Sequence, residues 1–224
     1  MKEAVYLSNK NGKSVIAIGA HPDDIEIGCG GTIKKFSDYG YDIIFLIATL
    51  GEKCDLKTRD SSAIKKKRRE ESIESANIFG VIKVYYLDMP DTNIEHNGIT
   101  VNAIEKYIKQ FKPEYVFTHT IEDKHQDHKN LAFSTISACR RSKTNILHYE
   151  SPSTAQSFLP TVFSDISDTL DYKIKAVKFF ASQHDKDYVD PEAIKGLAVY
   201  RGYISGSKYA EAFEVSKFYI MGIS

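Results

Sequence analysis

The chain has 224 residues, a length that fits one α/β domain, so we expect residues 1–224 to form a single domain. Its 30 lysines and arginines balance 30 aspartates and glutamates, which gives no general reason to expect binding to nucleic acid or to a membrane surface. The 3 cysteines are widely spaced without a CxxC pair, and neither an apolar signal segment nor a membrane-spanning stretch is present, which predicts a cytoplasmic protein with free thiols.

Short apolar runs alternate with longer amphipathic runs over the first two thirds of the chain. The runs that predict strands are Ser14–Gly19, Tyr41–Ala48, Ile82–Leu87, Tyr115–Thr118 and Asn145–Tyr149. The runs that predict helices are Thr32–Tyr39, Ser61–Phe79, Ile99–Phe111 and Asp127–Arg141, with a glycine-rich turn at residues 28–31 before the first of them. This alternation predicts an α/β fold, a Rossmann-like three-layer sandwich with a mostly parallel sheet.

The last third of the chain is less regular. Pro152 and Pro160 predict loops, because proline lacks the N–H that a strand or helix interior needs. Beyond them we expect helices over Leu170–Ser182 and Pro191–Tyr203, and a short strand over Phe213–Val215.

A charged cluster follows the first predicted strand. The run Ala20-His21-Pro22-Asp23-Asp24 places an imidazole and two carboxylates where a buried strand ends. The ends of parallel strands are where α/β folds bind ligands, and burying such charge is costly unless it is paired or bound to a metal. The cluster therefore indicates a functional site.

A second cluster follows the fourth predicted strand, between His119 and His128. Because both loops can lie at the same edge of a doubly wound sheet, His21, Asp24 and His128 can meet around one ion. Two imidazoles and one carboxylate form the ligand set of many catalytic zinc sites, and the same trio also suits ferrous iron.

Two other interpretations of these residues remain. In the first, the acids and histidines are helix caps and surface-loop groups. In the second, Gly19 and the glycines at 28, 30 and 31 form a dinucleotide-binding loop. Asp23, Asp24 and Glu26 weigh against the second interpretation, because carboxylates repel a pyrophosphate; the glycines instead allow a helix to approach the sheet closely.

The run from Ala20 to Thr32, AHPDDIEIGCGGT, resembles the signature of the PIG-L/LmbE-like deacetylases, and His125-Gln126-Asp127-His128 is similar to their second motif. Further similar segments, among them Thr49–Glu52 and Tyr209–Phe213, extend the resemblance over nearly the whole chain. Asp123 and Gln126 depart from residues common at those positions in relatives.

The resemblance implies a metal-dependent hydrolase that removes the N-acetyl group from an N-acetylglucosamine-type amino sugar or its conjugate. His21, Asp24 and His128 would bind the metal, normally zinc, and Asp23 would be the general base that takes a proton from water. His125 would stabilise the oxyanion or act as a general acid, with Asp127 orienting it. The expected sugar contacts are Glu52, Arg68 and Asp91, whereas His96, His119, His148 and His184 receive no role.

Two alternatives remain at this stage. The same metal site would serve an amidase acting on a thiol conjugate or on another non-sugar amide. A non-enzymatic binding module would need a broken catalytic set, yet Asp23, His125 and Asp127 are all present. The expected partner is thus a small-molecule substrate, and because relatives are often assembled, the resemblance also allows a homo-oligomer.

Overall fold

The computed structural model describes residues 12–53, 61–183 and 189–220. The strands are β1 Ser14–Gly19, β2 Asp42–Ile47, β3 Lys83–Tyr86, β4 Tyr115–His119, β5 Asn145–Tyr149, β6 Val162–Asp165 and β7 Ala210–Lys217. The α-helices are α1 Asp24–Asp38, α2 Ser61–Ile78, α3 Gly98–Phe111, α4 Gln126–Ala138, α5 Leu170–Val177 and α6 Pro191–Ser205, with a short 3₁₀ helix at Ala181–Gln183.

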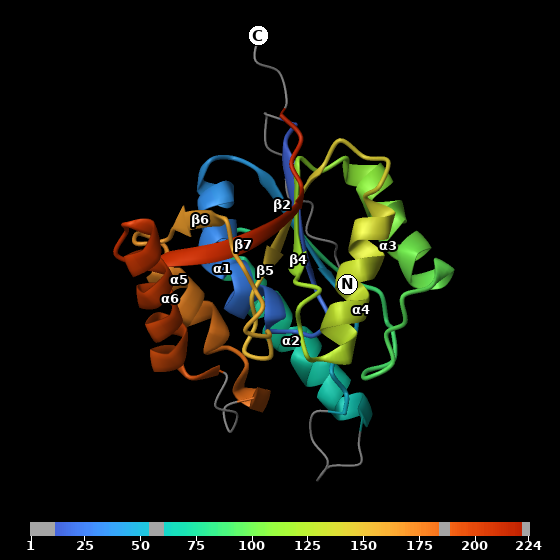
Figure 1. Cartoon of the computed structure of the whole chain (residues 1–224). Coiled ribbons are helices and arrows are strands. Elements are labelled where there is room, and N and C mark those ends of the chain that lie inside the picture. Colours follow the sequence, from blue (N-terminus) through green and yellow to red (C-terminus); the bar gives the residue numbers. More distant parts are fainter. Residues whose placement is uncertain (1–11, 54–60, 184–188, 221–224) are drawn as a thin grey trace.

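The strands form one sheet in the order β3-β2-β1-β4-β5-β7-β6. The first five strands in this order are parallel, and β7 runs antiparallel to both β5 and β6. Helices α1, α2, α5 and α6 lie on one side of the sheet, and α3 and α4 lie on the other (Figure 1). The predicted α/β class with a mostly parallel sheet is confirmed.

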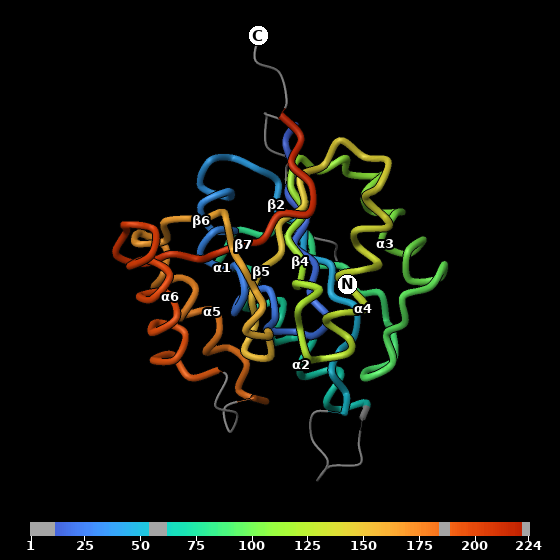
Figure 2. The backbone as a smooth tube through the Cα atoms, in the orientation of Figure 1, coloured from blue at the N-terminus to red at the C-terminus, as the bar shows by residue number. Residues whose placement is uncertain are grey.

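The order of the sheet matters for function, because later strands are added on both sides of β1. The chain moves from β1 to β2 on one side, and later returns to place β4 on the other side of β1. The tube in Figure 2 shows the β1 and β4 segments side by side in the middle of the molecule. At such a switch point the loops beyond the carboxyl ends of the two strands diverge and leave room for a ligand.

The sheet is anchored by two apolar clusters, one on each face. All six residues of β1 are buried, so its alternating side chains supply both clusters. Val15 packs with residues of α1, α2 and α5, whereas Ile16 packs with residues of α3 and α4. Burial of this strand on both faces gives the loop that follows it a rigid base.

Helix α1 begins eight residues earlier than the sequence predicts, at Asp24 rather than Thr32. The glycines at 28, 30 and 31 therefore lie inside the helix and not in a turn. The helix kinks at Cys29 (φ −142°), and the carboxylate of Glu211 on β7 accepts the N–H groups of Gly31 and Thr32 at 2.9 and 2.7 Å. A buried side chain far away in the sequence thus satisfies the amides at the kink.

The glycines of α1 do allow a close approach, as the sequence predicts. A Cβ atom on Gly28 would lie only 2.1 Å from the ring of Tyr149 on β5, so only glycine lets helix and sheet pack at this point.

The C-terminal third differs most from the sequence prediction. Strand β6 forms where only loop was expected, α5 ends at Val177 rather than Ser182, and β7 is longer than predicted.

Cys29 and Cys139 are buried free thiols, whereas Cys54 and His184 lie outside the described residues. Among the helices described, none combines the length and the apolar character needed to cross a bilayer.

Candidate metal and catalytic site

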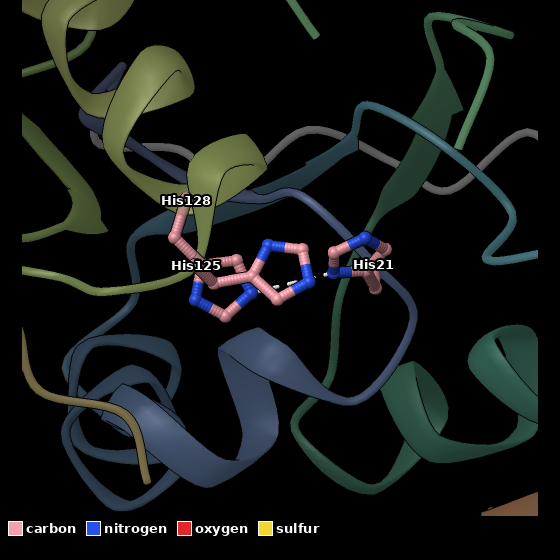
Figure 3. Close-up of side chains that lie close together, drawn as sticks. All are labelled: His21, His125 and His128. Carbon is pink, nitrogen blue, oxygen red and sulfur yellow. Dashed lines mark hydrogen bonds between the residues drawn. The ribbon is translucent and has the colours of Figure 1, made fainter. Parts of the chain in front are cut away.

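The two clusters predicted from the sequence meet at the switch point. His21 lies on the loop after β1, Asp24 begins α1, and His128 lies in the first turn of α4. In Figure 3 the rings of His21, His125 and His128 gather between the start of α4 and the loop after β1. Residues separated by about a hundred positions in the sequence thus form one site.

Donor atoms of His21, Asp24 and His128 form a triangle. His21 Nδ1 lies 3.3 Å from His128 Nε2 and 3.4 Å from Asp24 Oδ2, and His128 Nε2 lies 3.5 Å from Asp24 Oδ1. Ligands bonded to a tetrahedral zinc ion at about 2.1 Å stand about 3.4 Å apart from one another. The three side chains therefore fit a divalent metal without rearrangement.

Each imidazole in this triangle has a carboxylate on its far nitrogen. His21 Nε2 lies 3.2 Å from Asp91 and 3.4 Å from Asp127, and His128 Nδ1 lies 3.1 Å from Asp123. Metal-bound histidines characteristically donate their second N–H to such a partner, which fixes the tautomer and the ring orientation. This outer arrangement is what a site for a divalent cation requires.

These carboxylates stay ionised. Burial opposes their charge, yet hydrogen bonds from His21 and from the backbone of Lys53 lower the pKa of Asp91 to about 2. Hydrogen bonds from His128 and from two serine hydroxyls likewise hold the pKa of Asp123 well below its usual range, although burial acts against this shift.

His119 adds a further imidazole that the sequence analysis leaves without a role. It is fully buried at the end of β4, stacks on His128 with the ring centres 3.8 Å apart, and places Nε2 3.1 Å from Asp24 Oδ2. Burial lowers the pKa of His119 to about 4, so the ring is neutral near pH 7. His119 therefore contacts Asp24 from the interior side of the site.

Other combinations of nearby ligand atoms also occur at this site. Among the residues that the structure describes, three triplets have donor atoms within 4.8 Å of one another: His21 with His125 and His128, Asp24 with His119 and His128, and His21 with Asp91 and Asp127. His21 and His128 each occur in two of these three triplets.

Asp23 adopts an unusual backbone conformation beside the triangle. Its φ of 102° lies in the left-handed region, which costs free energy for a residue with a side chain. The guanidinium of Arg68 holds it there: Nη2 donates to the carbonyl of Pro22 and to Asp23 Oδ2, the latter at 3.2 Å. Burial raises the pKa of the Asp23 carboxyl to about 7, even though the Arg68 charge favours ionisation.

His125 and Asp127 contact each other through the backbone rather than through the carboxylate. The Asp127 N–H donates to His125 Nδ1 at 3.2 Å, so the His125 proton is carried by Nε2. The carboxylate of Asp127 instead accepts the N–H groups of Thr92 and Ile94 at 2.8 and 3.1 Å. Burial, together with the neighbouring His128 and His21, lowers the pKa of His125.

A cavity of about 350 Å³ opens over these groups, and two of the three expected sugar contacts line it. Arg68 and Asp91 face it, as do Lys53, Thr92 and Ser153. Glu52 does not: its Oε1 accepts the Asp91 N–H at 3.3 Å and pairs with Lys65. Glu52 therefore supports Asp91 from behind the cavity wall.

Asp123 is a second residue whose place in the site the sequence analysis did not assign. Its carboxylate accepts hydrogen bonds from the hydroxyls of Ser151 and Ser153, both at 2.6 Å, in addition to its contact with His128. Its position in the sequence could have indicated this role, because it follows β4 within the same cluster of acids and histidines as His125, Asp127 and His128. It links the α4 imidazole to the loop after β5.

Known proteins resemble this chain over most of its length. Diacetylchitobiose deacetylase from Thermococcus kodakarensis is 31% identical over 220 residues, which cover 89% of this chain and 81% of that protein. The structure of N,N'-diacetylchitobiose deacetylase from Pyrococcus horikoshii, in complex with an inhibitor, is 27% identical with a TM-score of 0.80 over 91% of this chain and 83% of its own.

The fold also occurs with another activity. GalB from Pseudomonas putida, a 4-carboxy-2-hydroxymuconate hydratase, superposes with a TM-score of 0.82 over 95% of this chain and 99% of its own, at 20% identity. Fold alone therefore does not define the reaction.

The PIG-L family profile, described as GlcNAc-PI de-N-acetylase, matches residues 16–139, the segment that holds every residue of the donor triangle. The chain belongs to the PIG-L family.

Proposed function

We propose that this chain is a single-domain, metal-dependent hydrolase that removes the N-acetyl group from an N-acetylglucosamine-type amino sugar or its conjugate. The observation that carries the proposal is the donor triangle of His21, Asp24 and His128, with a carboxylate behind each imidazole. These residues would hold zinc or ferrous iron. When bound, such an ion lowers the pKa of water towards 7 and polarises the amide carbonyl.

In this mechanism Asp23 would move the proton. Its carboxylate lines the cavity next to Asp24, and its pKa of about 7 lets it accept a proton from the attacking water and release it to the leaving amine near neutral pH. Arg68 orients the carboxylate through the contact at 3.2 Å. General acid–base catalysis of this kind contributes about 10²–10⁴-fold to the rate.

In this mechanism His125 would stabilise the oxyanion. Since its Nδ1 accepts the Asp127 N–H, its Nε2 is the donor nitrogen, and the ring lines the cavity beside His128. A neutral imidazole that donates a hydrogen bond to the developing oxyanion stabilises it without needing a charge of its own. The lowered pKa of His125 agrees with this neutral form.

The polar cavity wall supports a sugar as the group that carries the amide. Arg68, Asp91 and Thr92 offer donors and acceptors for hydroxyl groups. Similarity to a diacetylchitobiose deacetylase at 31% identity supports the same class of substrate. Hydrolysis of a thiol conjugate or of another non-sugar amide would use the same metal ligands and the same general base. Assays on sugar and non-sugar substrates distinguish these two substrate classes.

Acetate release tests the proposal. The protein is stripped with a chelator, reloaded separately with zinc and with ferrous iron, and assayed on N-acetylglucosamine, N,N'-diacetylchitobiose and N-acetylcysteine. We expect one metal to restore release from the sugars. Full activity in the presence of chelator, or release confined to the thiol compound, would refute the assignment.

A matched pair of variants tests the role of Asp23. Asp23→Asn should retain bound metal and lose about 10²–10⁴-fold in kcat, because it can no longer accept a proton. Asp38→Asn changes an exposed carboxylate at the far end of α1, the helix that Asp23 precedes, and should behave as the wild type. Wild-type kcat in Asp23→Asn would contradict the mechanism.

A further inference from the structure

A second cavity, of about 390 Å³, lies next to the catalytic one. Its walls come from α1, from the loop after β5, from α6 and from β7. Most of the side chains that line it are apolar, among them Ile27, Pro152, Ile194, Leu197, Ala198 and Ala212. The volume falls within the range of small-molecule sites, about 300–1,000 Å³.

The charged groups in the walls are already paired. Lys173 Nζ lies 2.6 Å from Glu211 Oε1, and both side chains are buried. Glu150 receives two hydrogen bonds from Arg201, at 2.7 and 2.6 Å. A charged ligand would have to compete with these pairs, and an apolar one would not. The cavity therefore favours an uncharged, apolar occupant, whereas most residues that line the catalytic cavity are polar.

Two residues line both cavities. Ile27 lies one helical turn after Asp23 and Asp24, and Pro152 lies on the loop that Asp123 holds through Ser151. A molecule whose amide lies at the donor triangle can therefore extend past Ile27 and Pro152 into the second cavity. This continuity points to a part of the same substrate rather than to a separate ligand.

We propose that this second cavity is a subsite for an aliphatic chain carried by the substrate. The inference rests on the proposed function, because it takes the donor triangle as the place of the amide. An N-acyl chain longer than acetyl and an alkyl aglycone on the sugar share the required chemistry. Each methylene buried there should raise kcat/KM about fourfold until the cavity is full.

Two substrate series distinguish the sources of the chain. One compares N-acetyl-, N-butanoyl- and N-hexanoylglucosamine, and the other compares the methyl and hexyl glycosides of N-acetylglucosamine. We expect kcat/KM to rise along one series, and the series that responds identifies which end of the substrate enters the cavity. Unchanged or falling values along both series would overturn the inference while leaving the proposed deacetylation intact.

A variant that fills the cavity provides the structural control. Ala193 lines the cavity from an exposed position on α6, so Ala193→Trp should abolish the gain with chain length and leave activity on N-acetylglucosamine unchanged. Val199→Trp, at an exposed position of the same helix outside the lining, should keep the gain. Persistence of the gain in Ala193→Trp would refute the assignment of this cavity.

Calorimetry separates this inference from the proposed function. Hexyl β-glucoside should bind to the wild type at least tenfold more tightly than methyl β-glucoside, and the difference should vanish in Ala193→Trp. This result would support the subsite even if no acetate were released from any sugar. Equal affinity of the two glucosides for the wild type, together with no gain along the N-acyl series, would overturn it.

Discussion

Replacing Asp123 by alanine should weaken metal binding without touching a proposed ligand. The side chain is fully buried, and Oδ2 accepts the Nδ1–H of His128 at 3.1 Å. The variant leaves that N–H without its carboxylate and also releases the hydroxyls of Ser151 and Ser153. The imidazole then loses both the partner that fixes its tautomer and the charge that makes it a stronger ligand.

The size of the effect follows from the contact that is lost. A hydrogen bond to a charged group contributes about 1.5–3 kcal/mol, which corresponds to about 13- to 160-fold in an equilibrium constant. Loss of an outer partner of a metal ligand lowers metal affinity about 10–100-fold. We therefore expect the dissociation constant for zinc to rise by about one to two orders of magnitude in Asp123→Ala.

Competition with a chromophoric zinc chelator measures this constant for the stripped protein. Lys124→Ala, at the exposed neighbouring position, serves as the control and should bind zinc like the wild type. Circular dichroism establishes that both variants are folded. A folded Asp123→Ala protein that binds zinc within twofold of the wild type would refute the argument that Asp123 supports His128 as a ligand.

Two further predictions concern stability. Glu211→Ala leaves the buried ammonium of Lys173 without its partner and should lower the free energy of unfolding by about 3–5 kcal/mol in urea titrations, whereas an unchanged midpoint would contradict the ion pair's role. Gly28→Ala forces a Cβ atom to within 2.1 Å of the Tyr149 ring and should destabilise the protein by about 1–3 kcal/mol. Gly196→Ala, where a Cβ atom meets nothing, should instead raise the melting temperature, and the same sign for both glycine variants would refute the packing argument.

Local patterns in the sequence determined the fold class. Alternating apolar and amphipathic runs reflect burial of a parallel sheet between helices, so the first five strands were located within a few residues. The start of α1 was missed, because three glycines normally disfavour a helix; Glu211, about 180 residues away, satisfies the amides at its kink. Strand β6 was missed because pairing with β7 defines it, and no local pattern records that pairing.

The sequence also determined which chemical groups the site contains, since the HPDD run and the second histidine cluster are both local. Only the tertiary structure decided their partners. It placed Asp91 and Asp127 behind His21, Asp123 behind His128, and Glu52 outside the cavity it was expected to line. Such contacts depend on how loops from different strands meet at the switch point. The tertiary fold determines that arrangement, and the sequence of a single segment does not.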